Sequence, residues 1–136
     1  MSNGLPDLNH PVSGQFWRAA SEHRLELSFC RECGECVWYP QSPTPCCQAE
    51  LDWREMGSNA RLITWTEVQM PINPNFEAPY AVALVEPAGS GRARVVSRLI
   101  GVDSDQLRCD MALRLDFVEL QNQDKQTFIA PVYRPA

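Results

Sequence analysis

Two cysteines separated by two residues form the strongest chemical signal in this sequence of 136 residues. In Cys30-Arg-Glu-Cys33-Gly34 both sulfurs can turn toward one ion, and the glycine lets the backbone fold beneath them. A structural Zn²⁺ is held by four such ligands in a tetrahedron. Cys46 and Cys47 follow at the separation expected of a second ligand pair. The sequence therefore predicts a zinc site made by Cys30, Cys33, Cys46 and Cys47.

The second half of this predicted site is irregular, because Cys46 and Cys47 are adjacent and have no residues between them. Cys36 is an alternative fourth ligand in place of Cys47. Some of the thiols can instead be small buried apolar groups, and Cys109, far along the chain, is expected in the core. Zinc with four thiolate ligands has no open coordination position, so the role of the ion would be structural.

The sequence does not indicate a separate catalytic site. Its two histidines are His10, in a polar N-terminal stretch, and His23, between an expected helix and an expected strand. Neither histidine lies near a nucleophile motif such as Gly-x-Ser-x-Gly. We therefore expect no catalytic activity from this chain alone.

The elements that position the cysteines change in character near Trp53. Before it, Ser13 is placed to cap a short helix over 15–22, and Leu25–Phe29 alternates like a strand that leads into Cys30. After it come five segments rich in β-branched or apolar residues, at 60–69, 79–86, 92–100, 112–120 and 127–133. Five strands with little helical periodicity favour a small closed sheet.

The expected fold is therefore mainly β and has two parts. Residues 1–53 would form an N-terminal helix and a zinc ribbon, and residues 54–136 a five-stranded OB-fold barrel. The net charge of −5 argues against a nucleic-acid partner. The first residues lack the features of a signal peptide, and no stretch is apolar enough to cross a membrane. We expect a cytoplasmic protein whose thiols stay reduced.

Several motifs occur in a recognisable order along the chain. They are Phe16-Trp17, Cys30 to Gly34, Tyr39-Pro40, the second cysteine pair, Leu51-Asp-Trp53, Gly57, Thr64-Trp-Thr66, Pro79-Tyr80, Ala83-Leu-Val85, Leu99-Ile-Gly101, Met111, Phe128 and Pro135. In this order the chain resembles the OB-fold acyl-CoA-associated proteins with a rubredoxin-like zinc ribbon, the family called domain of unknown function thirty-five. It departs where the family has Cys-Pro-x-Cys-Gly and this chain has Cys46-Cys47-Gln48.

The resemblance implies a non-catalytic accessory subunit. Its partner would be a thiolase-superfamily enzyme, such as an acyltransferase or a steroid side-chain aldolase or lyase, or an enoyl-CoA hydratase. It also implies a hetero-oligomer in lipid or steroid metabolism, with the barrel helping to hold a coenzyme A thioester. A nucleic-acid-binding module and a free-standing enzyme acting on such thioesters are the alternatives.

Two further groups of residues are candidates for contacts with the acyl-CoA and with the partner enzyme. Arg92, Arg94 and Arg98 share one face of the expected strand over 92–100, and guanidinium groups bind phosphate oxygens such as those of coenzyme A. The alternative is a solvated strand face. Phe16 and Trp17, on a short helix with little core of its own, are candidates for the partner interface.

Overall fold

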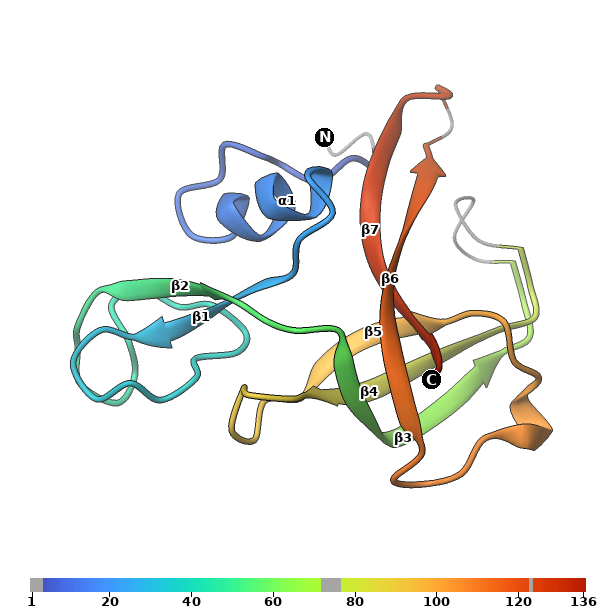
Figure 1. Ribbon diagram of the computed structural model, residues 1–136. Coiled ribbons are helices and arrows are strands. Elements are labelled where there is room, and N and C mark those ends of the chain that lie inside the picture. Colours follow the sequence, from blue (N-terminus) through green and yellow to red (C-terminus); the bar gives the residue numbers. More distant parts are fainter. Residues whose placement is uncertain (1–3, 72–76, 123) are drawn as a thin grey trace.

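The computed structural model describes residues 4–71, 77–122 and 124–136. Its first part, called here the ribbon lobe, contains α1 (Gly14–Ser21), β1 (Glu26–Cys30), β2 (Leu51–Glu55) and the cysteine-rich loop between the two strands. Its second part is a closed barrel of five strands, β3 to β7, and the two parts lie side by side (Figure 1). The predicted fold class, mainly β with one helix, a cysteine-rich ribbon and a five-stranded barrel, is confirmed.

The helix α1 begins where the sequence predicts, but not through the predicted cap. The side chain of Ser13 makes no capping hydrogen bond, because its backbone is already helical (φ −96°, ψ −10°) and not in the extended region that a capping residue adopts. Instead, Nδ1 of His10 accepts hydrogen bonds from the backbone N–H groups of Val12 and Ser13, both at 3.1 Å. Ala19 and Ala20 are the buried side chains of the helix.

The strands β1 and β2 form a two-stranded antiparallel sheet in which Cys30 is opposite Leu51. Every residue of β1 is buried, whereas β2 is only partly covered. The residue pattern does not predict β2, which continues to Glu55, beyond the expected end of the ribbon at residue 53. A two-stranded sheet is marginally stable by itself, so the ribbon lobe needs further support.

The barrel consists of β3 (Asn59–Val68), β4 (Tyr80–Pro87), β5 (Val95–Leu99), β6 (Ala112–Gln121) and β7 (Thr127–Pro135). The strand order is β3-β4-β5-β7-β6, and β6 pairs with β3 to close the barrel. All pairs are antiparallel except β5 and β7, which are parallel and meet at Leu99 and Tyr133. A short 3₁₀-helix, η1 (Ser104–Gln106), lies between β5 and β6. This is the connectivity of a five-stranded Greek-key OB barrel.

The sequence pattern explains why these segments form a barrel. Along β4 the side chains alternate between buried and partly exposed at every position, as expected of a strand with one face toward a core. A bulge between Leu62 and Thr64 lets β3 bend as the sheet closes. The strand expected over 92–100 is shorter than predicted and begins only at Val95, so Arg92 and Arg94 precede it.

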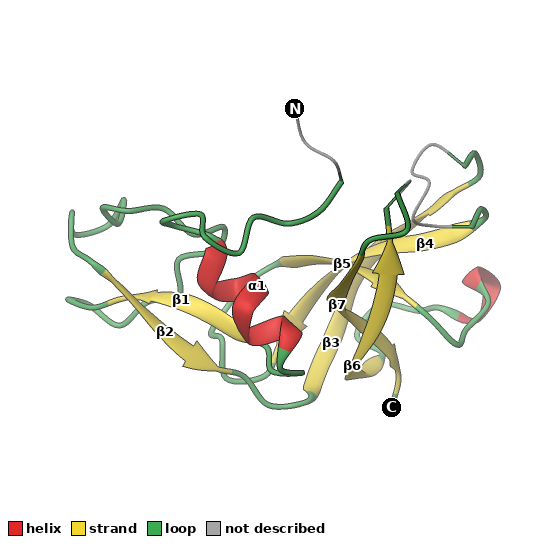
Figure 2. Cartoon of the chain, turned by 90° about the horizontal axis from the view of Figure 1, so that it is seen from above, coloured by secondary structure: helices red, strands yellow, loops and turns green. Residues whose placement is uncertain are grey.

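One continuous hydrophobic core joins the ribbon lobe to the barrel. It contains Leu25, Leu27 and Phe29 beside barrel residues such as Leu62 and Val85. The helix α1 packs against both β1 and β7, and Figure 2 shows it between the β1–β2 sheet and the barrel. No helix in the part of the chain that the structure describes is long and apolar enough to cross a membrane.

Candidate functional site

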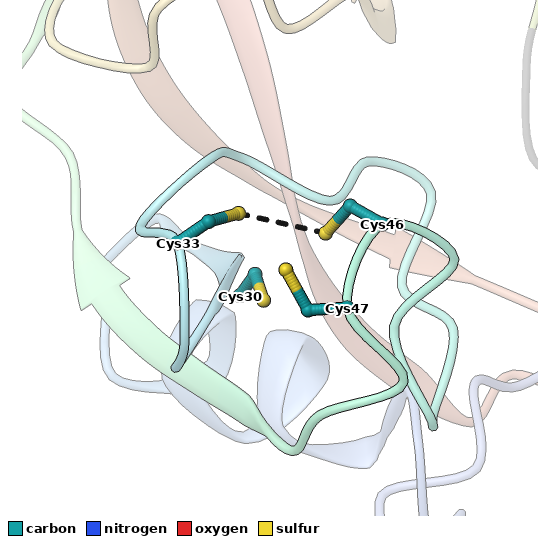
Figure 3. Close-up of side chains that lie close together, drawn as sticks. All are labelled: Cys30, Cys33, Cys46 and Cys47. Carbon is teal, nitrogen blue, oxygen red and sulfur yellow. Dashed lines mark hydrogen bonds between the residues drawn. The ribbon is translucent and has the colours of Figure 1, made fainter.

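The sulfur atoms of Cys30, Cys33, Cys46 and Cys47 all lie within 4.8 Å of one another. Cys30 ends β1 and Cys33 lies in the turn after it, while the adjacent pair comes from the second half of the loop (Figure 3). A zinc–sulfur bond of about 2.3 Å gives sulfur–sulfur distances of about 3.8 Å in a tetrahedron. The measured 3.6 Å between the sulfurs of Cys33 and Cys46 is close to that value. The residues present therefore fit a Zn²⁺ ion.

The backbone of each half of the loop holds its cysteines in place. In the first half, the N–H of Gly34 donates to the carbonyl of Cys30, and the N–H of Cys30 donates to the carbonyl of Glu35, both at 2.8 Å. Gly34 has a φ of +79°, which favours glycine. The second half is closed by Thr44, whose N–H donates to the carbonyl of Ala49 at 2.8 Å.

Thr44 also contributes its side chain, which is fully buried beside the cysteines. Its hydroxyl oxygen accepts a hydrogen bond from the N–H of Ala49 at 3.0 Å and lies 3.4 Å from the sulfur of Cys30. Thr44 is not among the site residues predicted from the sequence. The available signal was a hydroxyl residue two positions before Cys46, at a point where the chain must turn.

The thiols of the cluster have strongly different proton affinities. The hydrogen bond with Thr44, with backbone N–H groups in addition, lowers the pKa of Cys30 to about 6. The neighbouring side chain of Cys33, with desolvation in addition, raises the pKa of Cys47 to about 12. Zinc binds thiolates, so an ion at the cluster would displace the protons that the thiols retain.

The other two cysteines lie outside the cluster. Cys36 is half-buried against the core, and burial raises the pKa of its thiol to about 11. Cys109 is exposed, so its predicted place in the core is wrong. Leu107 occupies the core position, and the chain then turns so that the N–H of Asp110 donates to the carbonyl of Leu62 at 2.8 Å. This turn directs Cys109 outward.

A cavity of about 720 Å³ lies between the ribbon lobe and the barrel. The ribbon lobe contributes Phe29, Gly34, Glu35, Cys36, Trp38 and Arg54 to its wall, and the barrel side contributes the segment from Gly89 to Arg94. Arg98, in contrast, lines a separate cavity of about 260 Å³ at one end of the barrel, where its guanidinium lies 5.9 Å from the ring centre of Tyr80. The structure thus brings Arg92 and Arg94 together and places Arg98 elsewhere.

Three arginines line the cavity between the lobes, and two of them are paired with carboxylates. Arg54, Arg92 and Arg94 line it, and Glu35 is the carboxylate on its wall. Arg54 lies 4.6 Å above the ring of Phe29 and pairs with Asp52 at 3.2 Å, and Arg94 pairs with Glu86. Arg92 is exposed and forms no ion pair with the residues that the structure describes. It is the guanidinium best placed to receive an external anion.

Phe16 and Trp17 belong to a row of aromatic rings that crosses the molecule. The ring centres of Trp38 and Phe16 are 5.3 Å apart, those of Phe16 and Trp17 5.0 Å, and those of Trp17 and Phe128 6.1 Å. The row thereby links the cysteine loop, α1 and β7. Tyr39 extends it beyond Trp38 and is 66% exposed. Phe16 and Trp17 themselves are half-buried, so part of their surface is already used inside the chain.

The two histidines lie apart from the cysteine cluster and from the cavity between the lobes. His10 accepts backbone hydrogen bonds near the start of α1. His23 is exposed and stacks on Phe117, with ring centres 5.1 Å apart. Neither histidine is hydrogen-bonded to a serine or cysteine side chain within the described ranges.

Comparison with known proteins agrees with this architecture. Residues 53–118 match the family model described as the C-terminal OB-fold domain of ChsH2. A solved structure described as the Ltp2-ChsH2(DUF35) aldolase superposes with a TM-score of 0.81 at 26% identity, over 96% of this chain and 98% of that one. The chain is an OB-fold protein of the DUF35 family. The family resemblance predicted from the motifs is thereby confirmed.

Two further relatives place this DUF35 protein more broadly. A DUF35 protein of unknown function from Sulfolobus solfataricus has a TM-score of 0.55 at 16% identity, over 76% of this chain and 75% of that one, and shares the fold. A Thermomonospora curvata protein named "Probable enoyl-CoA hydratase alpha subunit" is 32% identical over 126 residues. That match covers 89% of this chain but 37% of the relative, so the chain spans little more than a third of its length.

Proposed function

We propose that this DUF35 protein is a non-catalytic accessory subunit that associates with an acyl-CoA enzyme. The partner is a thiolase-superfamily enzyme, either an acyltransferase or a steroid side-chain aldolase or lyase, or it is an enoyl-CoA hydratase. The observation that carries the proposal is the match over nearly the whole chain to a protein described within an Ltp2-ChsH2 aldolase. The pathway is then one of lipid or steroid metabolism.

The cysteine cluster supports a structural role for zinc in this subunit. Cys30, Cys33, Cys46 and Cys47 would hold the ion with four sulfurs and leave no position for water or substrate, so the metal would organise the loop and not the chemistry. Such a site requires reduced thiols, which agrees with the cytoplasmic location expected from the sequence.

The cavity between the lobes supports the binding of an acyl-CoA shared with the partner enzyme. Arg92 and Arg94 lie where they can meet phosphate oxygens, and the proposed phosphate site consists of these two residues. Arg98 lies too far along the barrel to share that cavity and would contact another part of the ligand or of the partner. Phe16 and Trp17 would contribute their exposed edges to the partner interface.

Purification of the tagged chain from its native host tests the proposal. We expect a defined complex with one acyl-CoA enzyme, identified by mass spectrometry and confirmed by rebuilding the complex from the two purified proteins. The rebuilt enzyme should turn over its substrate faster than the enzyme alone, while the chain alone remains inactive. A chain that is recovered alone and binds single-stranded nucleic acid in a salt-sensitive manner would contradict the proposal and favour the nucleic-acid alternative.

A further inference from the structure

Thr44 ties together the loop that carries the two adjacent cysteines. Its N–H donates to the carbonyl of Ala49 and its carbonyl accepts from the N–H of Gln48, both at 2.8 Å. Its hydroxyl oxygen accepts a third hydrogen bond, from the N–H of Ala49 at 3.0 Å. Cys46 and Cys47 lie between the two ends of this closed loop. One residue therefore fixes the loop that presents the second ligand pair.

The four cysteines of the cluster differ in their access to solvent. Cys30 is buried, whereas Cys33, Cys46 and Cys47 are exposed. Water can solvate the sulfurs of the exposed cysteines, but the negative charge of a buried thiolate must be met by donors of the protein itself. For Cys30 the turn that follows it supplies backbone N–H groups. The hydroxyl of Thr44 reaches the same sulfur from the other half of the loop, at 3.4 Å.

The hydrogen bonds of the Thr44 hydroxyl indicate the direction of this contact. A hydroxyl has one proton to donate and two lone pairs that accept. One lone pair receives the N–H of Ala49, and the side chain is fully buried. If the sulfur of Cys30 were the donor, the hydroxyl proton would have no acceptor among the residues that the structure describes, which is costly in a buried position. The favoured arrangement is the one in which the hydroxyl donates to the sulfur.

This donor is important because the second half of the cluster is irregular. Cys30 and Cys33 are separated by two residues, and the turn between them directs N–H groups at the first sulfur. Cys46 and Cys47 have no residues between them, so no turn of this kind can form there. Thr44 precedes the adjacent pair by two positions and contacts Cys30. Its side chain therefore connects the two halves of the cluster.

We propose that Thr44 is the positioning residue of the zinc site, whose hydroxyl donates to the thiolate of Cys30 and whose backbone closes the loop of the adjacent cysteines. In this way an irregular pair serves as the second half of a four-sulfur site. The inference rests on the proposed function for the occupancy of the cluster by zinc. Groups that orient metal ligands commonly change metal affinity by 10-fold to 100-fold when they are removed.

The first experiment measures zinc affinity by competition with a chromogenic chelator. We expect Thr44→Val, which keeps the shape of the side chain and removes the hydroxyl, to weaken zinc binding by about 10-fold or more. Thr44→Ser keeps the hydroxyl and should restore most of the affinity. Ser42→Ala removes an exposed hydroxyl from the same loop and should bind zinc within about 3-fold of the wild type. Equal affinities of Thr44→Val and the wild type would overturn the proposal.

The second experiment distinguishes a hydrogen bond to sulfur from a general loosening of the loop. With Co²⁺ in place of zinc, the energies of the sulfur-to-cobalt charge-transfer bands depend on the hydrogen bonds that the thiolates accept. We expect these bands to move to lower energy in Thr44→Val, because the thiolate of Cys30 loses a donor, and to stay in place in Thr44→Ser. Bands that lose intensity in Thr44→Val without moving would show that Thr44 supports only the fold, and would overturn the proposal.

The wild type separates this proposal from the proposed function. A wild type that binds Zn²⁺ and Co²⁺ through four sulfurs, beside a Thr44→Val variant with the same affinity and the same bands, would overturn the role of Thr44 and leave the proposed zinc site in place. A wild type that binds neither ion would contradict the zinc site itself, and the role of Thr44 with it.

Discussion

The ribbon lobe and the barrel reach stability by different means. The barrel closes five strands on themselves, and each strand turns one face toward a shared core. The ribbon lobe has one short helix, two strands of five residues and a loop of twenty residues between Cys30 and Leu51 that forms no strand or helix. Its share in the common core comes mainly from β1, and its other supports are the cysteine cluster and the row of aromatic rings. A closed sheet is thus supported by its own pairing, whereas a small ribbon depends on cross-links of another kind.

The largest expected effect comes from breaking the cysteine cluster. In Cys30→Ser the chain should lose zinc and the order of the ribbon lobe, because a structural zinc contributes on the order of 10 kcal/mol to the folding of such modules. Backbone amides of β1 and β2 should lose protection from hydrogen exchange, while those of β3 and β4 keep it. Cys109→Ser, at an exposed position outside the cluster, is the matched control and should retain both zinc and protection. If the amides of β1 and β2 stay protected from hydrogen exchange without metal, the ribbon lobe does not depend on the cysteine cluster for its order.

The reverse experiment weakens the barrel. Leu62 is fully buried in the core, and Leu62→Ala should lower the free energy of unfolding by about 2–5 kcal/mol because it leaves a cavity. Val96 is 67% exposed on strand β5, so Val96→Ala should change stability by about 0.5 kcal/mol or less. Urea unfolding followed by circular dichroism measures both variants. Zinc content per chain should not change in either, and its loss in Leu62→Ala would show that the lobes are not separately supported.

The row of aromatic rings allows a smaller test of how the lobes are joined. Phe16 contacts both Trp17 and Trp38 and is half-buried, so Phe16→Ala should cost about 2 kcal/mol, less than a fully buried phenylalanine. Tyr39→Ala, at the exposed end of the same row, should cost about 0.5 kcal/mol or less. Urea unfolding gives both free energies, and limited proteolysis near Gly57 reports on loosening between the lobes. Equal effects of the two substitutions would show that the row does not join them.

The smallest effect is a gain in stability. The hydroxyl of Tyr133 is buried and has no hydrogen-bond partner among the residues that the structure describes. Tyr133→Phe should therefore stabilise the barrel by about 1 kcal/mol. Desolvation also raises the pKa of Tyr133 above its ordinary value of 10.0, so the folded wild type keeps its proton where the unfolded chain loses it. Wild-type stability should fall as the pH rises above about 10.

Tyr133→Phe should show less of this alkaline loss. Urea unfolding of both proteins at pH 8 and at pH 11 measures the difference. If both proteins lose the same amount of stability between these values, Tyr133 is not the group responsible. If the variant is less stable than the wild type at pH 8, the hydroxyl of Tyr133 forms a hydrogen bond that stabilises the barrel, and the prediction is wrong.

The sequence predicted the barrel better than the ribbon, for a physical reason. In β3 most of the apolar residues alternate with period two, and β4 is a near-continuous apolar run; both signals are local. The strand β2 has only Leu51 and Trp53 before charged residues follow, and its pairing with β1 is fixed by the closure of the cysteine loop. The beginning of β5 was also misplaced, because nothing in the residues after Gly91 marks where barrel pairing begins.

The candidate site also has a part that the sequence predicts and a part that only the fold shows. The spacing of Cys30 and Cys33 indicated the cluster directly, since ligand spacing is a local property. Thr44 and Ser42 are both hydroxyl residues of a proline-rich loop, and only the fold shows that Thr44 is the one that reaches Cys30. The convergence of Arg54 with Arg92 depends on how the ribbon lobe packs on the barrel. A residue pattern within one strand cannot reveal this convergence.

The closure of the barrel by two short junctions has a consequence for its motions. The contacts within β3–β4–β5 and within β6–β7 join strands that follow one another along the chain. These two units meet through three residue pairs between β3 and β6 and a single pair, Leu99 with Tyr133, between β5 and β7. Bonds that close long loops form late and open early. We therefore expect the barrel to open transiently at the β5–β7 junction. The amide of Ile100 should then exchange its hydrogen before the amides that pair β6 with β7.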